Sequence, residues 1–399
     1  MLLYGAARTG VGIHDIFYNA VAGFYLASYG MPNVAIGFLA NERSLIGALL
    51  QPLVGAASDR LQTPLGRRRP VMLLVIPTIL GFLALAMRPD TWLVVLIFIL
   101  GPLFLGLAVT AYQVLLPDCV VPEQRGLANG VNVFMGFVGG IGLLLVAFRV
   151  WESQPGIVFI GVAASLAVGF AITMLTIKEP ADGVSEEAEE RFSLGDYLQS
   201  ILQYRSATLY VASYFFFWFG IGGITPFITR FGNEELGVPQ NETFLLLLAV
   251  MIATMVSAAP AGWLGDRIGK KVMTSWGLIA FAVFILIGSQ IETRDQAIVI
   301  LAFAGIGQAI PSVLAYPLFT ELVPARRMGE LTGLSTMVWS LAQPIGATVF
   351  GAVADATGSL RSVLVGGSIA LLISWLILRA VNVPRKVPPE NTAPVADGA

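Results

Sequence analysis

The chain has 399 residues, of which 56% are hydrophobic and only 12% charged, and its mean hydropathy is +0.79. This composition excludes an ordinary soluble globular protein and is typical of a protein that lies in a lipid bilayer. The net charge of −2 offers no basic surface to a nucleic acid, and the single cysteine, Cys119, excludes an internal disulfide.

Apolar windows of roughly 20 residues recur along nearly the whole chain, and this is the length that an α-helix needs to cross a hydrocarbon core of about 30 Å. Few residues precede the first window, so we expect no removable signal peptide. We predict an all-α integral membrane protein with twelve transmembrane helices, at residues 9–30, 33–57, 70–88, 92–117, 124–148, 156–177, 206–231, 240–264, 271–290, 296–320, 328–352 and 360–381.

Lysine and arginine set the predicted orientation. If both termini are cytoplasmic, most of the 23 basic residues fall in cytoplasmic segments, as the positive-inside rule requires. We therefore expect a multi-pass protein of the cell inner or plasma membrane with both termini in the cytoplasm.

A charged hairpin joins the second and third predicted helices, and a second copy follows about half a chain later. Basic side chains here can offset the negative end of a helix dipole, and Asp59 can pair with Arg125 at the inner end of the fifth helix. We predict that the hairpins latch the cytoplasmic side closed; the alternative is that their arginines only fix topology. The gating candidates are Gly55, Asp59, Arg60, Arg67, Arg68, Arg69 and Arg125 with, in the second copy, Asp266, Arg267, Lys270 and Lys271.

The repeat extends beyond the hairpins. Gly30 and Pro32 recur 207 residues later as Gly237 and Pro239, and after the first hairpin, which carries four extra residues, the offset falls to 203. Such offsets predict two six-helix halves of common architecture. The predicted domains are a first bundle at 1–178, a cytoplasmic linker with a short amphipathic helix at 179–205, a second bundle at 206–382 and a disordered tail at 383–399.

Two six-helix halves, each with a Gly-x-x-x-Asp-Arg hairpin after its second helix, resemble the major facilitator superfamily. Within it, residues 51–55 (QPLVG), 58–60 (SDR) and 66–70 (GRRRP) look like the branch of proton-coupled sucrose carriers, and the glycoside-cation symporters are a looser comparison. The resemblance implies secondary transport by alternating access, with a substrate site between the halves. It also implies a proton as coupling ion, with sodium as the alternative.

Four ionisable residues lie well inside the predicted helices, all in the first half: His14, Asp15, Glu42 and Arg43. Such groups are costly in a bilayer and are commonly paired or functional. Helix geometry permits an Asp15–Arg43 pair and brings Glu42 near the level of Tyr18. We expect Asp15 or Glu42 to take up the coupling proton; the alternative is a static ion pair. His14 titrates in a useful range, although a lone histidine near a helix end is more often structural.

Uncharged polar and aromatic side chains near mid-membrane are the candidate substrate contacts. Amides and stacking aromatics suit a neutral, hydroxyl-rich solute such as a sugar, although aromatic residues on membrane helices mostly pack or lie at interfaces. The candidates are Asn19, Tyr112, Gln113, Asn129 and Asn132 in the first half and Tyr214, Trp218, Gln308, Trp339 and Gln343 in the second.

No metal-ligand cluster, nucleophile elbow or phosphate loop occurs in the sequence, so we expect neither an enzyme nor a bound metal or other cofactor. We predict a monomeric secondary transporter that moves a small solute, a sugar or glycoside, across a lipid bilayer. The alternatives are an efflux or lipid-like solute carrier on the same scaffold, and a membrane receptor or scaffold without transport.

Overall fold

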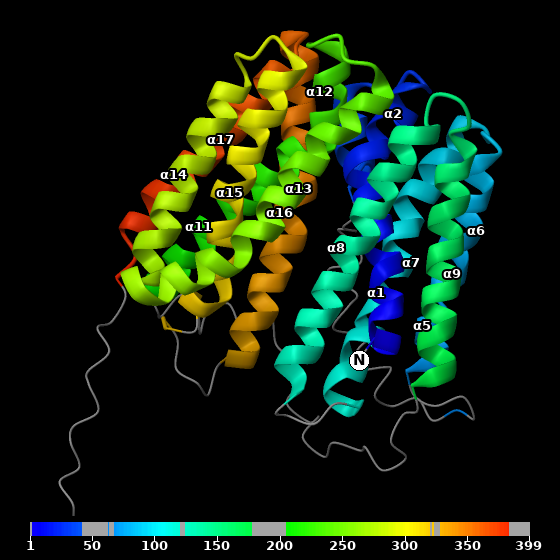
Figure 1. Ribbon diagram of the computed structural model, residues 1–399, viewed down its shortest axis with the longest axis horizontal. Helices are drawn as coiled ribbons and strands as arrows, with labels where there is room; N and C mark the ends of the chain where they lie inside the picture. The colour runs from blue at the N-terminus through cyan, green and yellow to red at the C-terminus, as the bar shows by residue number, and fades with distance from the viewer. Residues whose placement is uncertain are drawn as a thin grey trace, which may run out of the picture.

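The computed structural model describes residues 2–41, 63, 68–119, 124–177, 205–319, 321–322 and 328–382. For residues 2, 114, 116–119, 125–127, 328–334 and 336 it describes the backbone only. These ranges contain helices and turns and no strand, and the long helices run side by side through the molecule (Figure 1).

We call residues 2–177 the first half and residues 205–382 the second half. The helices of the first half are α1 (Leu2–Ile16), the π-helix η1 (Phe17–Val21), α2 (Ala22–Ala27), α3 (Asn33–Leu39), α5 (Arg69–Met72), α6 (Val75–Ala86), α7 (Thr91–Cys119), α8 (Arg125–Val150) and α9 (Gly156–Thr176). Those of the second half are α11 (Arg205–Ile224), the 3₁₀-helix η3 (Thr225–Phe227), α12 (Ile228–Glu234), α13 (Gln240–Ile268), α14 (Lys270–Gly288), α15 (Arg294–Phe319), α16 (Met328–Thr357) and α17 (Arg361–Arg379).

Large apolar side chains cover much of the outer surface of these helices. Leu175, Trp92 and Val256 are each more than half exposed, which would be costly in water and is favourable against lipid. In the described part of the chain, ten helical segments are long and apolar enough to cross a membrane. An eleventh rod is α1–η1–α2, and α3 begins the remaining predicted helix, whose continuation lies outside the described residues. The predicted all-α membrane architecture is therefore confirmed.

The first and seventh helices differ from their predicted form because each is interrupted. The first helix begins at Leu2 instead of residue 9, so Arg8 lies inside α1, and its regular winding gives way to η1 at Phe17. The seventh changes to η3 where Pro226 cannot donate a backbone hydrogen bond. At the 207-residue offset, Phe17 corresponds to Ile224, so the interruptions occupy equivalent places, and η1 and η3 pack against each other.

Two ends of the molecule can be distinguished. We call the end where α1 begins and α17 ends the terminal face, and the opposite end, which carries the turns between α2 and α3 and between α12 and α13, the far face (Figure 1). Both of these turns contain a glycine in the left-handed region, Gly30 with φ of 74° and Gly237 with φ of 66°. Residues with a Cβ rarely adopt this backbone conformation, which explains why glycine recurs in the repeat.

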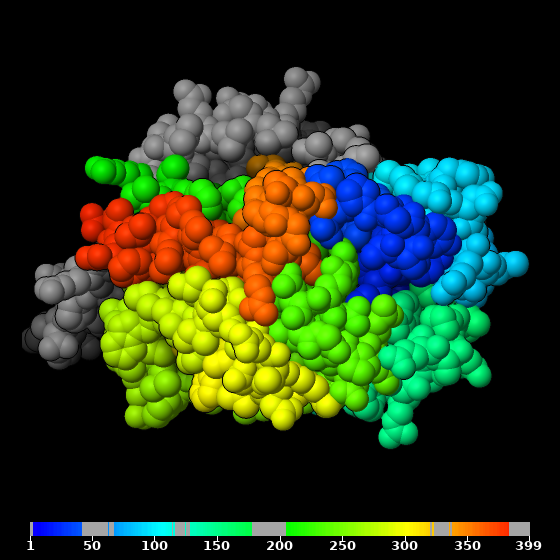
Figure 2. All heavy atoms as spheres, turned by 90° about the horizontal axis from the view of Figure 1, so that it is seen from above, coloured from blue at the N-terminus to red at the C-terminus, as the bar shows by residue number. Residues whose placement is uncertain are grey.

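The halves touch each other along their far-face ends. The pairs in contact are α3 with α16, α8 with α13, η1 with η3, and α2 with α12. In the space-filling view of this face, orange residues of α16 abut blue residues of the first half (Figure 2). The packing is close because glycines permit it: a Cβ on Gly37 would collide with the Ala347 carbonyl, and one on Gly351 with the Asn33 carbonyl.

Candidate transport site

The far-face ends of the halves are joined by a helix cap that crosses between them. The Asp355 carboxylate, near the end of α16, accepts hydrogen bonds from the backbone N–H groups of Asn33 at 2.9 Å and Val34 at 2.8 Å. These donors begin α3 and have no partner within that helix, and the positive end of the helix dipole favours the carboxylate. At the 203-residue offset Asp355 corresponds to Glu152, beside Trp151, whose Nε1 donates to Gln240 Oε1 at 3.0 Å in the equivalent contact between α8 and α13.

Arg230 is a second cross-half contact, and it is a buried charge. Its Nη1 donates to Asn33 Oδ1 at 2.6 Å, and its Nε donates to Glu234 Oε1 at 2.8 Å. Arg230 lies in α12, near the end of the helix predicted at 206–231. The (i, i+4) spacing of Arg230 and Glu234 was the signal that could have revealed this pair.

Three ionisable side chains gather on α1, just before η1. The Arg8 Nη1 lies 3.5 Å from Asp15 Oδ2, as the seven-residue spacing permits on one helix face, and His14 Nδ1 lies 3.4 Å from Asp15 Oδ1. Arg8 and Asp15 are partly exposed, whereas His14 is buried, with its ring 4.7 Å from that of Tyr18. Among the described residues, His14 Nε2 has no hydrogen-bond partner. This cluster joins two predicted residues to Arg8, which the prediction had left outside the helix.

Of the polar candidates in the first half, Tyr112 and Asn132 are held in a buried network. The Tyr112 hydroxyl lies 2.5 Å from Asn132 Oδ1 and 2.8 Å from the Tyr4 carbonyl oxygen, and the Tyr4 and Tyr112 rings stack at 4.6 Å. These contacts join α1, α7 and α8. Gln113 and Asn129 are exposed, and Asn19 lies half-buried in η1.

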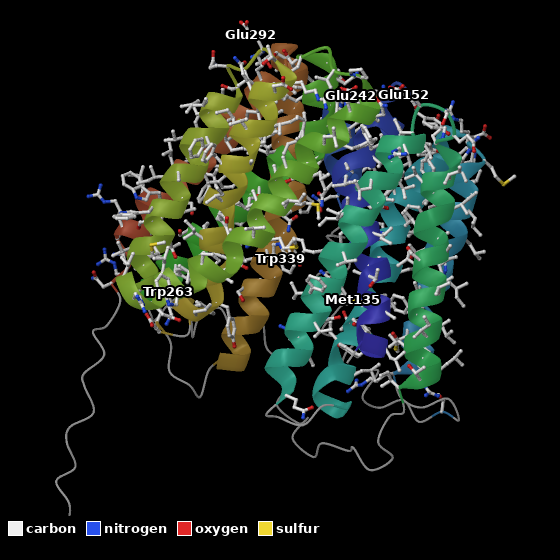
Figure 3. The ribbon with its side chains drawn as sticks, in the orientation of Figure 1. Met135, Glu152, Glu242, Trp263, Glu292 and Trp339 are labelled. Atoms are coloured by element: carbon white, nitrogen blue, oxygen red, sulfur yellow. The ribbon has the colours of Figure 1, made fainter. Side chains whose placement is uncertain are left out.

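In the second half the structure brings most of the candidates together where α11 packs on α16. The Trp218 and Trp339 rings lie 5.2 Å apart, and the Tyr214 and Trp218 rings 6.0 Å apart. Gln343 lies one turn beyond Trp339 and packs against Gly222, one turn beyond Trp218. Within the described residues, Gln343 Nε2 and Trp218 Nε1 are buried without a hydrogen-bond partner. Trp339 is at mid-height in the molecule (Figure 3), and Gln308 is half-buried on α15.

The second charged hairpin makes its described contacts within its own half. Lys270 Nζ lies 2.6 Å from Glu321 Oε1 and 4.0 Å from Asp266 Oδ1, and Asp266 is 74% exposed. Lys271 Nζ donates to the carbonyls of Arg379 and Val381 at the end of α17, and the Arg267 guanidinium lies 3.9 Å from the centre of the Trp263 ring.

Only part of the first charged hairpin lies among the described residues. Arg69 Nη2 donates to the Ile177 carbonyl at 2.8 Å, and Arg68 is buried. The candidates that lie outside the described residues, or for which only the backbone is described, are Glu42, Arg43, Gly55, Asp59, Arg60, Arg67 and Arg125. The Asp15–Arg43 pair and the Asp59–Arg125 latch therefore stay predictions.

Two helical halves whose interrupted helices meet at equivalent positions are a recurrent architecture of secondary transporters. Over residues 3–382 the chain matches the family model described as "MFS/sugar transport protein". The chain belongs to this family of the major facilitator superfamily, and it is a transporter of a small solute and not an enzyme.

Relatives and solved structures agree with this assignment. The chain is 24% identical over 395 residues to the "Uncharacterized MFS-type transporter YxiO" of Bacillus subtilis (strain 168), covering 92% of this chain and 89% of that protein. It is 26% identical over 376 residues to the "Probable metabolite transport protein CsbC" of the same organism, covering 82% and 79%. The crystal structure of the nucleoside transporter NupG superimposes with a TM-score of 0.74 at 14% identity, covering 95% of this chain and 98% of that one. The predicted all-α membrane fold of the superfamily is thus confirmed.

Proposed function

We propose that the chain moves a neutral, hydroxyl-rich solute, a sugar or glycoside, by alternating access coupled to protons. The observation that supports this most is the Arg8–Asp15–His14 cluster on α1. Asp15 and His14 correspond at the repeat offset to Gly222 and Ile221 in α11, so the shared scaffold does not require their charge. Charged side chains are energetically costly inside a membrane, and the shared scaffold does not need these ones. The cluster is therefore a candidate coupling site.

Proton uptake by Asp15 provides a coupling step. When Asp15 is ionised, Arg8 attracts it, and their partial exposure lets water reach both side chains. A proton on the Asp15 carboxylate cancels this attraction and removes the cost of enclosing an ionised carboxylate when the halves rearrange. His14 Nδ1 can pass the proton or orient the carboxylate. Asp15 is the proposed carrier among the described residues, and Glu42 and Arg43 stay candidates.

The aromatic pair of the second half provides a surface for the solute. Trp218 and Trp339 offer ring faces against which a sugar ring can stack, and Gln343 Nε2 is a free donor among the described residues. Every candidate contact in this half is uncharged, and this favours a neutral solute over a strong organic anion.

The described arrangement corresponds to one state of the proposed cycle. The two predicted bundles, 1–178 and 206–382, move relative to each other about the site, and the far face is the outer side because both termini are proposed to be cytoplasmic. The Asp355 cap, Arg230 and the Trp151–Gln240 bond close the far face, while the exposed Asp266 belongs to the latch that closes the terminal face in the opposite state. The chain acts as a monomer.

The test is uptake into proteoliposomes that contain the purified protein, across a panel of mono- and disaccharides and glycosides, with and without a pH gradient. We expect at least one sugar to accumulate only with the gradient. Asp15→Asn should lose gradient-driven accumulation by roughly tenfold or more and retain sugar exchange without a gradient. The matched control is Asp90→Asn, an exposed far-face carboxylate that should transport like the wild type.

Each part of the proposal can fail separately. No uptake of any sugar would contradict the solute class, and reversed gradients would then test export. Accumulation driven by sodium alone would contradict proton coupling. Undiminished accumulation by Asp15→Asn would remove Asp15 from the mechanism.

A further inference from the structure

A pocket of about 560 Å³ opens in the first half near the far face, separate from the α1 cluster and from the Trp218–Trp339 pair. Its lining comes from α2, the end of α6, the turn between α8 and α9, the start of α9, and the first residue of α13, Gln240. The volume lies within the roughly 300–1,000 Å³ of pockets that hold small molecules. Glu152, which lines the pocket, lies at this end of the molecule (Figure 3).

Four aromatic rings form one side of the pocket. Tyr25 and Phe159 have ring centres 4.7 Å apart, Phe159 and Trp151 6.4 Å apart, and Trp151 and Phe24 6.5 Å apart. Because each ring contacts the next, they make a continuous wall. A cage for a cation needs ring faces set apart around the charge, and this wall does not supply them.

The polar groups of the pocket carry no net charge. Arg88 and Glu152 are both exposed, so each can hydrogen-bond a ligand at the mouth of the pocket. Ser28 Oγ donates to the Tyr25 carbonyl at 2.7 Å and keeps its lone pairs as acceptors. One cation and one anion favour neither an anionic nor a cationic ligand, whereas hydroxyl groups can bond both.

We propose that this pocket binds a small neutral ring compound that carries hydroxyl groups, a pyranoside in chemical class, and that the bound compound favours closure of the far face. The apolar face of the ring stacks on the aromatic wall, and the hydroxyl groups on its edge bond Arg88, Glu152 and Ser28. The ligand need not be transported, so this proposal does not depend on the proposed function.

Ligand binding is linked to closure of the far face because one residue that lines the pocket belongs to the second half. Gln240 begins α13 and accepts the hydrogen bond of Trp151 Nε1, and Trp151 and Phe24 also pack on Phe244 of the same helix, at 6.1 and 6.2 Å. The pocket is therefore complete only while α8 and α13 are in contact at the far face. A ligand that binds this state more tightly than the open state increases its population.

Binding is tested by calorimetry on the full-length protein in lipid nanodiscs, with phenyl β-D-glucopyranoside as probe. Gly156 lines the pocket, and a Cβ there would meet only the Ala86 carbonyl, at 3.8 Å, so Gly156→Leu should fill the pocket without disturbing the core. The matched control is Gly161→Leu on the same helix, where a Cβ meets nothing within 4 Å and the residue is exposed. We expect Gly156→Leu to weaken binding about tenfold or more and Gly161→Leu to leave it unchanged. No binding to the wild type, or equal loss or equal retention in the two variants, would overturn the proposal.

Ligand class and closure have their own measurements. Benzoate and benzyltrimethylammonium should bind at least about tenfold more weakly than the glucoside, and equal binding of either would overturn the proposal that the ligand is neutral.

For closure, spin labels are attached at Gln154→Cys and Glu292→Cys, in far-face turns of opposite halves, with Cys119→Ser as background. Phenyl glucoside should increase the population at the shorter label distance, and this increase should be absent in Gly156→Leu. An unchanged distribution in the parent chain would overturn the link to closure.

Discussion

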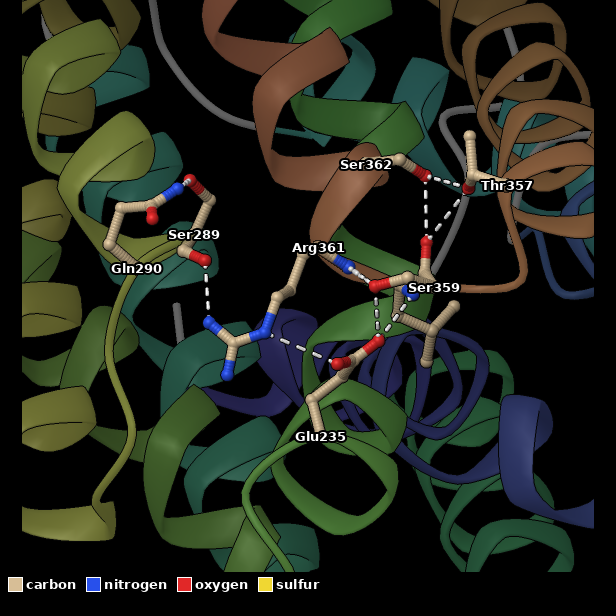
Figure 4. A network of polar contacts seen from close by, with 8 residues as sticks. Glu235, Ser289, Gln290, Thr357, Ser359, Arg361 and Ser362 are labelled. Atoms are coloured by element: carbon tan, nitrogen blue, oxygen red, sulfur yellow. Dashed lines mark hydrogen bonds and ion pairs between the residues drawn. The ribbon is translucent and has the colours of Figure 1, made fainter.

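Glu235 ends the seventh helix rod and joins three segments of the second half. Its Oε1 accepts from Ser359 Oγ at 2.6 Å and from the Leu360 N–H at 2.7 Å, and its Oε2 accepts from Arg361 Nε at 3.2 Å (Figure 4). Arg361 Nη1 in turn donates to the Ser289 carbonyl at 2.7 Å. Partial burial opposes ionisation, but these hydrogen bonds and the Arg361 charge outweigh it and hold the pKa of Glu235 below its ordinary value of 4.5.

The lowered pKa of Glu235 predicts how its contribution depends on pH. A carboxylate with a depressed folded-state pKa stabilises the fold above its unfolded pKa, and the contribution is lost as the pH falls through the folded value. We expect Glu235→Gln to lower the apparent Tm at pH 7, and the difference from the wild type to shrink as the pH falls below 4.5. Thermal unfolding in nanodiscs across pH 3–8 measures this; a difference that grows towards low pH would contradict it. Glu292→Gln, an exposed carboxylate at the same face, is the control.

Arg88 is the one described non-glycine residue with positive φ, at 51°, just beyond the end of α6. This conformation costs an L-residue about 1 kcal/mol, and glycine adopts it freely. We expect Arg88→Gly to raise the apparent Tm above that of Arg88→Ala, because both variants remove the guanidinium and only one relieves the backbone. Thermal unfolding of the pair decides this, and equal values would show that the turn is not strained.

At the scale of elements, the cap between α16 and α3 is the clearest contact that the proposed opening of the far face must break. Asp355→Ala removes two hydrogen bonds to a carboxylate, worth about 2 kcal/mol together, which corresponds to roughly a 30-fold shift in population. We expect Asp355→Ala to populate the longer distance between labels at residues 154 and 292. Asp355→Asn keeps a side-chain oxygen that can cap the helix, so it should increase the population at the longer label distance much less.

A control separates the cap from a general effect of charge. Asp295 is an exposed carboxylate in the first turn of α15, also near the far face, and among the described residues it has no hydrogen bond or ion pair to the other half. Asp295→Ala should leave the label distances unchanged. If Asp355→Ala behaves like Asp295→Ala, the cap does not hold the far face closed.

At the scale of the whole molecule, the proposed alternating-access cycle requires each face to close in turn, and glycine contacts bring the helices together at the far face. A leucine at Gly351 has no room against the Asn33 carbonyl, so Gly351→Leu should keep α16 away from α3 and hold the far face open. We expect a loss of transport of about tenfold or more, with solute binding retained. The control is Gly142→Leu on α8, where a Cβ meets nothing within 4 Å. Normal transport by Gly351→Leu would contradict closure through this contact.

Sequence by itself determined the class of fold. A chain with 56% hydrophobic residues in long apolar runs satisfies its backbone hydrogen bonds in lipid by forming helices, and the 207-residue repeat preserves turns that need glycine. Most described helix ends agree with the prediction within a few residues, since apolar runs and the glycine and proline residues of turns are local signals. The same local signals singled out Asp15, His14, Trp218 and Trp339.

Tertiary structure decided which of these residues meet. The pairing of Asp15 with Arg8 depended on α1 beginning earlier than its apolar run, and the Asp355 cap joins residues more than 300 positions apart. The aromatic pocket likewise combines α2, α6 and α9 with one residue of α13. Helix periodicity fixes which face a residue occupies on its own helix, but only the packing of the helices fixes what that face touches.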